Sequence, residues 1–313
     1  MFVVILRVVC NQKKENIDMK TLNILKFIYN HPFNSEKKIG GLLKFFKWQI
    51  NCRLNPYPVL YPYTENSKFI IWKGLTGATG NLYCGLMEYD DMAFLLHFLR
   101  PNDLFIDIGA NVGAYTILAS SEINAKTIAI EPVPSTFKNL MDNILINQMQ
   151  EKVKALNIGL GSKNGKLKFT KSYDTVNHVA TENETDTIEV DINTLDTILS
   201  TEPSPILLKI DVEGFETEVL NGAEKTLSNT SLKAIIIELN DSGQRYGYDE
   251  NQIHNKLIEL GFKTYSYNPK TRQLKETETF GTHNTIYLRG KEFVEERIKS
   301  ARQIKIGSTQ QRV

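Results

Sequence analysis

The stretch that most constrains this chain runs from Asp103 to Ser120. Its apolar run, 104–108, is short and rich in branched side chains, so it predicts a buried parallel strand that carries Asp107 near its carboxyl end. A loop with Gly109 and Gly113 follows, and helical spacing resumes after it. A strand, a tight glycine loop and a helix whose free amide groups face that loop are typical of a nucleotide-type cofactor site.

The spacing around this loop favours one kind of cofactor over another. A dinucleotide site reads G-x-G-x-x-G, whereas here the loop is Gly-Ala-Asn-Val-Gly and Asp107 precedes it. A carboxylate there would repel a pyrophosphate but suits a cationic amino group. A second predicted strand, 127–131, ends in Glu131, 24 residues after Asp107, where it would accept hydrogen bonds from both ribose hydroxyls. The alternative is that Asp107 is only a helix N-terminal charge and Glu131 only a strand-end residue.

Three segments resemble the FkbM family of S-adenosylmethionine-dependent methyltransferases: Asp107–Gly113 (DIGANVG), Ile130–Pro132 (IEP) and Leu208–Glu216 (LKIDVEGFE). The likeness extends to Gly85–Glu88 and, upstream, to His31–Asn34 and Lys47–Ile50. It implies an α/β, Rossmann-like class I fold, a doubly wound and mostly parallel seven-stranded sheet with an antiparallel last strand. It also implies S-adenosyl-L-methionine as cofactor, bound by Glu88, Asp107, Gly109, Asn111, Gly113, Glu131, Ile158 and Gly159.

The rest of the chain fits such a sheet, because strands and helices alternate after residue 104. Strands are expected at 104–108, 127–131, 153–158, 206–211, 233–239, 262–267 and 283–288, and helices at 90–100, 113–121, 135–147, 193–200, 216–227 and 249–260. A polar insertion, 159–191, with strands at 166–171 and 187–191, lies at the ligand-binding rim, where it would select the substrate.

Charge divides the chain unevenly. Residues 1–86 hold 12 Lys and Arg against 4 Asp and Glu, a balance of +8, while the remainder holds 25 against 32, a balance of −7. We therefore expect a basic, aromatic-rich N-terminal extension over 1–86 that covers the site, a methyltransferase domain over 87–290 and a C-terminal tail over 291–313, helical at first and then frayed. Within the extension, 42–50 has amphipathic helical spacing, which suits either packing on the domain or a membrane surface.

Two other segments of the N-terminal part have distinctive compositions. The apolar opening, 1–10, is too short to span a membrane, and either Met1 or Met19 would serve as the start. The glycine-rich run 74–80 lacks a G-K-[ST] ending, so it is no P-loop, and it predicts either plain turns or a mobile lid. Three widely spaced cysteines without a C-x-x-C pair predict a reducing, cytoplasmic location.

The carboxyl ends of the later strands present the candidate catalytic groups. Transfer of a methyl group to a sugar hydroxyl needs a base, because such hydroxyls are weak acids. His283 is the first candidate, since an imidazole titrates near neutrality, and Asp211 and Glu213 are the alternatives. A further alternative is a Mg²⁺ site, for which Asp211, Glu238 and Asn240 would supply hard oxygen ligands.

The sequence thus predicts an O-methyltransferase acting on a hydroxyl of a sugar, glycan or related natural product. The expected partners are a small-molecule or glycan acceptor and, by peripheral contact, a membrane or lipid-linked glycan, but no nucleic acid, because the catalytic part is acidic and carries no reader motif. Two alternatives stay open: a non-catalytic cofactor-binding scaffold in a biosynthetic complex, and an NAD-dependent oxidoreductase, against which the missing G-x-G-x-x-G argues.

Overall fold

The computed structural model describes residues 19–173, 176–281, 283–307 and 311–313. The chain divides into two compact units, with the division between Pro56 and Tyr57. The apolar opening 1–10 and the alternative start Met1 lie outside the described residues. Within the described ranges, no helix has the length and the apolar character needed to cross a membrane.

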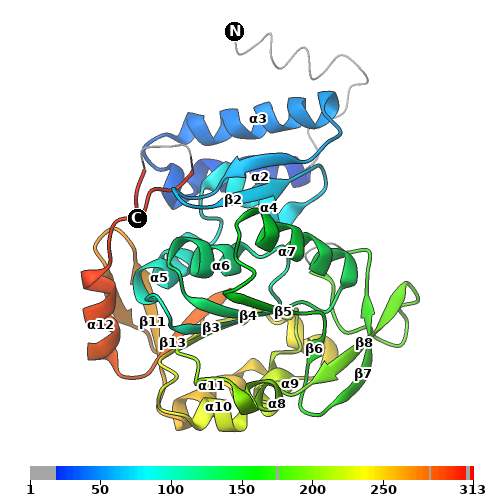
Figure 1. Cartoon of the computed structure of the whole chain (residues 1–313), viewed down its shortest axis with the longest axis vertical. Helices are drawn as coiled ribbons and strands as arrows, with labels where there is room; N and C mark the ends of the chain where they lie inside the picture. Colours follow the sequence, from blue (N-terminus) through cyan, green and yellow to red (C-terminus); the bar gives the residue numbers. More distant parts are fainter. Residues whose placement is uncertain (1–18, 174–175, 282, 308–310) are drawn as a thin grey trace. The chain divides into compact units, whose positions relative to one another are not determined.

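The smaller unit is a pair of helices (Figure 1). Helix α2 (Met19–Asn30) leads through the short 3-10 turn η1 (Pro32–Asn34) into helix α3 (Lys38–Leu54), which contains the amphipathic segment expected over 42–50. The two helices pack closely at Gly41, where an added Cβ would lie 2.9 Å from Cγ2 of Ile28 in α2 and 2.5 Å from Nδ2 of Asn34 in η1. The Asn34 side chain in turn donates to the carbonyl of Ile28 at 3.0 Å.

The larger unit is built on an eight-stranded sheet, counted over the described residues, with the order β12-β11-β13-β10-β9-β3-β4-β5. Its strands are β3 (Leu104–Ile108), β4 (Lys126–Ile130), β5 (Val153–Leu156), β9 (Leu207–Ile210), β10 (Ala234–Glu238), β11 (Lys263–Asn268), β12 (Gln273–Glu276) and β13 (Asn284–Leu288). Strand β13 runs antiparallel to both of its neighbours, β10 and β11, whereas β10, β9, β3, β4 and β5 are parallel. The predicted class I sheet with an antiparallel last strand is confirmed.

The prediction of seven strands was one short. Strand β12 pairs antiparallel with β11 at the edge of the sheet, and its four residues are mostly exposed. An exposed edge strand needs no apolar run, so the sequence around Gln273 gave no strand signal. In contrast, β3 and β9 are buried at every position. Their mostly apolar runs therefore predicted strands from the sequence.

Helices cover both faces of the sheet, with α5, α6 and α7 on one side and α8 to α11 on the other (Figure 1). Their bounds are α5 (Tyr89–Phe98), α6 (Ala114–Ile117) continued by the π-helical turn η2 (Leu118–Glu122), α7 (Pro134–Ile146), α8 (Leu195–Ile198) with η4 (Leu199–Thr201), α9 (Glu216–Asn221), α10 (Glu224–Ser228), η5 (Ser242–Tyr246) and α11 (Glu250–Glu259). The single helix expected over 216–227 was wrong, because the chain breaks at Gly222, where an added Cβ would lie 2.1 Å from the Gly161 carbonyl oxygen.

The segment before α5 is more regular than its sequence suggested. Strands β1 (Val59–Pro62) and β2 (Lys68–Ile71) form an antiparallel hairpin. The glycine-rich run forms helix α4 (Thr76–Cys84), so the interpretation as plain turns was wrong. Asn81 supports this helix: its side chain donates to the Gly77 carbonyl at 3.2 Å and accepts from the Met87 amide at 2.8 Å.

The polar insertion folds as a small sheet of its own. Strands β6 (Gly159–Leu160), β8 (Thr187–Asn193) and β7 (Gly165–Thr170) pair in that order, which confirms the two strands predicted in the insertion. Phe169, Val179, Val190 and Ile192 form its core.

The chain after Gly290 is also ordered by packing. Helix α12 (Lys291–Ser300) is followed by Ile304 and Ile306, both fully buried, and Ile306 forms a bridge with Thr64 of the larger unit. Arg302 pairs with the buried carboxylate of Glu122. For its described residues, 291–307 and 311–313, the expectation of a frayed tail was therefore wrong.

Candidate active site

The loop between β3 and α6 is held by buried hydrogen bonds. Asp107, 2% exposed, points from β3 toward the helix that follows, and its Oδ2 accepts from Thr116 Oγ1 at 2.6 Å. Gly109 has a φ of +77°, and an added Cβ there would lie 1.8 Å from the carbonyl oxygen of Asp211. This loop therefore needs glycine because it lies directly against the backbone at the end of β9.

Glu131 closes the other side of the same loop. Its Oε2 accepts from the amide of Asn111 and its Oε1 from the amide of Val133, both at 3.0 Å. Burial raises the pKa of Glu131 to about 7, although both amides oppose the shift. Each of the two oxygens accepts one hydrogen bond from a backbone amide, and a carboxylate oxygen can accept more than one. Glu131 can thus hold two further donors from the cavity beside it.

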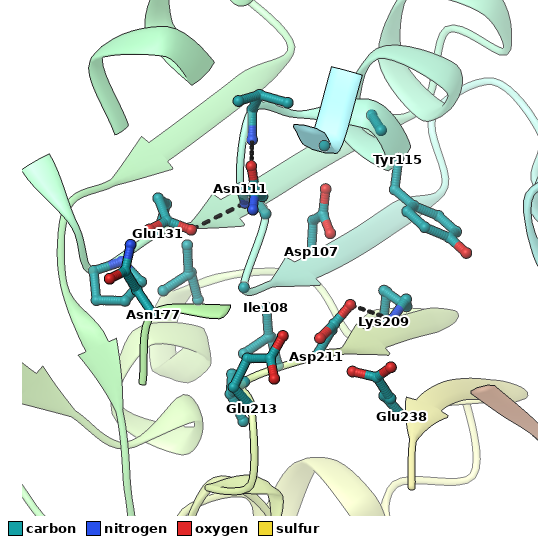
Figure 2. Close-up of a pocket in the computed structure, with 18 of the residues that line it drawn as sticks. Asp107, Ile108, Asn111, Tyr115, Glu131, Asn177, Lys209, Asp211, Glu213 and Glu238 are labelled. Carbon is teal, nitrogen blue, oxygen red and sulfur yellow. Dashed lines mark hydrogen bonds and ion pairs between the residues drawn. The ribbon is translucent and has the colours of Figure 1, made fainter. Parts of the chain in front are cut away.

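A cavity of about 310 Å³ lies over the carboxyl ends of β3, β4, β9 and β10 (Figure 2). Ten of the residues singled out from the sequence line it: Glu88, Asp107, Gly109, Asn111, Glu131, Ile158, Gly159, Asp211, Glu213 and Glu238. Residues from the N-terminal half of the larger unit and from the insertion complete the wall, among them Thr76, Asn81, Tyr115, Phe169 and Asn177.

One end of the cavity contains a lysine surrounded by acids. The side chain of Lys209 is 2% exposed, and its Nζ donates to Asp211 Oδ2 at 3.1 Å and to Asn284 Oδ1 at 3.0 Å. It also lies 5.5 Å from the centre of the Tyr115 ring. Burial opposes the charge on Lys209, but Asp211, Glu88 and Glu238 outweigh it and raise its pKa above the usual range. The ammonium therefore stays charged.

Asp211 and Glu238 differ in their protonation at this end. Burial opposes ionisation of Asp211, yet Lys209 and a hydrogen bond from Glu238 hold its pKa below the usual range. Burial and the charge of Asp211 raise the pKa of Glu238 to about 9. At neutral pH, Glu238 is accordingly a neutral acid that donates to an ionised Asp211. Burial and Asp211 also raise the pKa of Glu213 to about 7.

Tyr115 and Glu88 form another part of the cavity wall. The Tyr115 hydroxyl donates to Glu88 Oε2, and burial keeps the pKa of Tyr115 well above its ordinary value. Glu88 immediately precedes α5 and its side chain does not cap that helix. Its carboxylate is therefore held by Tyr115 and lies at the cavity.

Three predicted site residues do not line the cavity. Gly113 lies behind the loop, where an added Cβ would meet Leu140 at 2.7 Å. Asn240 accepts from the amide of Ser242 at 3.0 Å and so shapes a turn. His283 is exposed, and its backbone carbonyl accepts from Leu239 at 2.9 Å. The residue that β13 contributes to the acidic end is Asn284.

The acids could also present oxygens to a cation. Among the described residues, Asp211, Glu213 and Glu238 each offer a carboxylate oxygen, all within 4.8 Å of one another. Glu213 thus takes the position that was expected for Asn240. However, the Lys209 ammonium already contacts Asp211 and supplies positive charge at this place.

Lys209, Tyr115 and Asn177 line the cavity but were not predicted as site residues. The sequence did indicate a role for Lys209, because a lysine within a buried apolar strand is rare unless it is paired with an acid. Tyr115 and Asn177 had none, since an aromatic residue in a helix and an amide in a polar loop are common without a role.

Comparison with known proteins gives the family. The model for the methyltransferase FkbM domain matches residues 107–264, the span that forms the glycine loop, Glu131 and the acidic end. This chain belongs to the FkbM methyltransferase family. It is thus an S-adenosylmethionine-dependent methyltransferase, as the resemblance implied, and the oxidoreductase alternative is not supported.

Individual proteins resemble this chain to different degrees. Hexuronic acid methyltransferase AglP of Haloferax volcanii is 32% identical over 180 residues, 56% of this chain and 70% of that protein. Methyltransferase 1 of Beauveria bassiana is 30% identical over 182 residues, 50% of this chain and 72% of that protein. Among solved structures, precorrin-6y C5,15-methyltransferase of Geobacter metallireducens has a TM-score of 0.36 at 14% identity, over 64% of this chain and 87% of that one, too distant to support an inference.

Proposed function

We propose that this methyltransferase acts on a hydroxyl group of a neutral sugar, glycan or related natural product. The observation that carries the proposal is that one cavity joins two buried carboxylates, Asp107 and Glu131, to an ionised Asp211 held by Lys209. Asp107 and Glu131 suit a cationic nucleoside cofactor. Asp211, held by Lys209, suits removal of a proton from the acceptor.

The cofactor end is assigned by the chemistry of its acceptors. Glu131 would accept from both ribose hydroxyls, because each of its oxygens already accepts a single amide. Asp107 would bind the methionine ammonium, and Glu88 and Asn111 lie beside them. Ile158 and Gly159 would contact the adenine. When bound, S-adenosylmethionine supplies a methyl group on a sulfonium, which passes to the acceptor oxygen while sulfur keeps the electron pair of the broken bond.

Asp211 is the base in this proposal. It is ionised at neutral pH, whereas His283 is exposed and outside the cavity lining. Because its pKa is low, Asp211 would accept the hydroxyl proton only as the oxygen bonds to carbon and becomes more acidic. Lys209 is a positioning residue that fixes the Asp211 carboxylate, and Glu238 donates to it. Aligning the reactants supplies the larger part of the rate, up to roughly 7–11 kcal/mol.

The charge at this end of the cavity selects the acceptor. Its lining contains Glu88, Asp211, Glu213 and Glu238, of which Glu238 is protonated at neutral pH, and Lys209 is the one lysine there among the described residues. A carboxylate on the acceptor would meet this negative field, whereas neutral hydroxyls can donate to the same oxygens. AglP is named for a hexuronic acid, and the acidic lining here favours a neutral acceptor instead. Since Lys209 already supplies the cation, the proposal needs no Mg²⁺.

The proposal carries two further expectations from the sequence. The protein would work in the cytoplasm, where its cysteines stay reduced. It would not use a nucleic-acid acceptor, because residues 87–313 hold 25 basic against 32 acidic side chains and a phosphate backbone requires a basic surface.

The test has two arms. In the first, calorimetric titration with S-adenosylhomocysteine compares the native chain with Glu131→Gln, which keeps the shape but loses the charge. Affinity should fall about 10 to 150-fold, while Glu278→Gln, an exposed glutamate, should have no effect. Equal affinities would reject the role of Glu131.

The second arm measures methyl transfer to a panel of neutral glycosides and to matching uronic acids. Asp211→Asn should lower kcat roughly 100 to 10,000-fold with little change in cofactor affinity, and turnover should require a neutral acceptor. Cofactor binding without turnover on any hydroxyl would favour the non-catalytic scaffold. Activity lost on chelation and restored by Mg²⁺ would favour the metal site.

A further inference from the structure

Helix α3 of the smaller unit has two apolar faces. A surface helix usually has a single apolar stripe, which packs on its neighbours. Here one face is buried and contains Gly41, Phe45 and Trp48. The helical period of 100° per residue places these three within about 60° of one another.

The second face lies on the opposite side of the helix and is exposed. We call it the outer stripe: Ile39, Leu43, Ile50 and Leu54, whose exposed fractions are 61%, 41%, 44% and 79%. The same period places the four within an arc of about 60°, and Phe46, half-buried, falls on its border. The stripe therefore runs along most of the helix and is not used by the packing of α2 on α3.

Basic side chains border the outer stripe. Arg53 lies on one edge and Lys47 on the other, and both are exposed. Residues 19–56 as a whole hold seven Lys and Arg against one acidic residue, Glu36. Apolar side chains between basic ones are the pattern of a helix that lies flat in the headgroup region of an anionic bilayer.

We propose that the outer stripe of α3 docks on the surface of an anionic lipid bilayer. The charge argues against a second copy of the chain as the occupant, because two such faces would bring Lys47 and Arg53 of each copy together. Lipid phosphates instead neutralise them. The inference is independent of the acceptor chemistry, since no residue of the outer stripe lines the cavity.

The experiment is flotation of the full chain with vesicles of two kinds, phosphatidylcholine alone and two parts phosphatidylcholine to one part phosphatidylglycerol. Binding should require the anionic lipid. The double variant Leu43→Asp/Ile50→Asp should reduce binding at least about 20-fold, and Lys47→Gln/Arg53→Gln about five-fold or more for each charge removed. All four positions are exposed, so the fold should persist, and unchanged affinity for S-adenosylhomocysteine would verify it.

Matched controls replace similar groups of the larger unit. Leu145→Asp/Ile258→Asp changes two exposed apolar residues, and Lys163→Gln/Lys225→Gln two exposed lysines; neither should affect flotation. The proposal is overturned if the full chain does not float with anionic vesicles or if the outer-stripe variants bind as well as the native chain. A dimer in solution that those variants dissociate would assign the face to a second copy. Binding that appears only in a chain starting at Met19 would assign it to residues 1–18.

Discussion

At the scale of single residues, the acidic end of the cavity depends on one buried charge. Without Lys209, the half-buried carboxylate of Asp211 would lie beside Glu213 and Glu238 and would lose the ammonium that it contacts at 3.1 Å. With it, the pKa of Asp211 falls while that of Glu238 rises to about 9. Two carboxyl groups of the same chemistry thus differ in protonation because only one contacts the ammonium.

The pKa of Glu131 leads to a pH prediction. Without ligand, burial raises this pKa to about 7, and hydroxyl donors from a ribose would lower it. Binding therefore favours the ionised form, so affinity should be full above pH 7. Below that pH it should fall by up to about tenfold per unit.

Titration with S-adenosylhomocysteine at a series of pH values measures this. Glu131→Gln removes the titrating group and should flatten the part of the profile near pH 7, while Asp107, with a pKa raised to about 6 by burial, would still act at lower pH. An affinity of the native chain that stays constant or rises on acidification would contradict the assignment.

Residue positions could be predicted from the sequence where strand ends determine them. Asp107 and Glu131 lie at the ends of adjacent parallel strands, and such ends meet at one edge of the sheet. His283 lies at the same edge, but successive side chains of a strand point to opposite faces. Asn284 therefore contacts Lys209, whereas His283 is exposed. A shift of one residue along the strand thus decides which side chain enters the cavity. Strand bounds cannot be predicted from the sequence to within one residue.

At the scale of elements, the loop after β3 and the end of β9 form one rigid contact. The amide of Asp211 donates to the Ile108 carbonyl at 3.0 Å, and Gly109 leaves no room for a Cβ beside the Asp211 carbonyl. The cofactor loop and the proposed base are therefore positioned by the same backbone. The loop and the strand were each predicted from the sequence. Their contact depends on the order of the strands in the sheet, which only the family resemblance implied.

Gly109→Ala tests this coupling. The new Cβ must displace the Asp211 backbone, and alanine is strained at a φ of +77°. The free energy of unfolding should fall by roughly 1–3 kcal/mol or more. The rate of methyl transfer should also fall, by more than the loss of folded protein accounts for. Gly165→Ala is the matched control, since its Cβ would meet nothing within 4 Å. Urea unfolding and turnover of both variants give the comparison, and similar values would reject the coupling.

At the scale of the molecule, the last residues complete the larger unit. Glu122 has no exposed side-chain surface, and it accepts from Thr64 at 2.5 Å and from Asn66, besides pairing with Arg302. Segments from the start, middle and end of this unit therefore meet at one carboxylate. The alternation of polar and apolar residues over 303–306 was a readable strand-like signal, but it is too short to show which distant segment it packs against.

Removing one buried side chain from this segment should destabilise the whole unit. Ile304 is fully buried, so Ile304→Ala leaves a cavity and should lower the free energy of unfolding by about 2–5 kcal/mol. Ile258→Ala deletes the same atoms at a position that is 42% exposed and should cost much less. Urea unfolding of the three proteins measures the difference. Because the segment would unfold together with the sheet, the transition should stay single and its slope unchanged. An effect of Ile304→Ala no larger than that of the control, or a separate early transition, would show that the end of the chain does not stabilise the sheet.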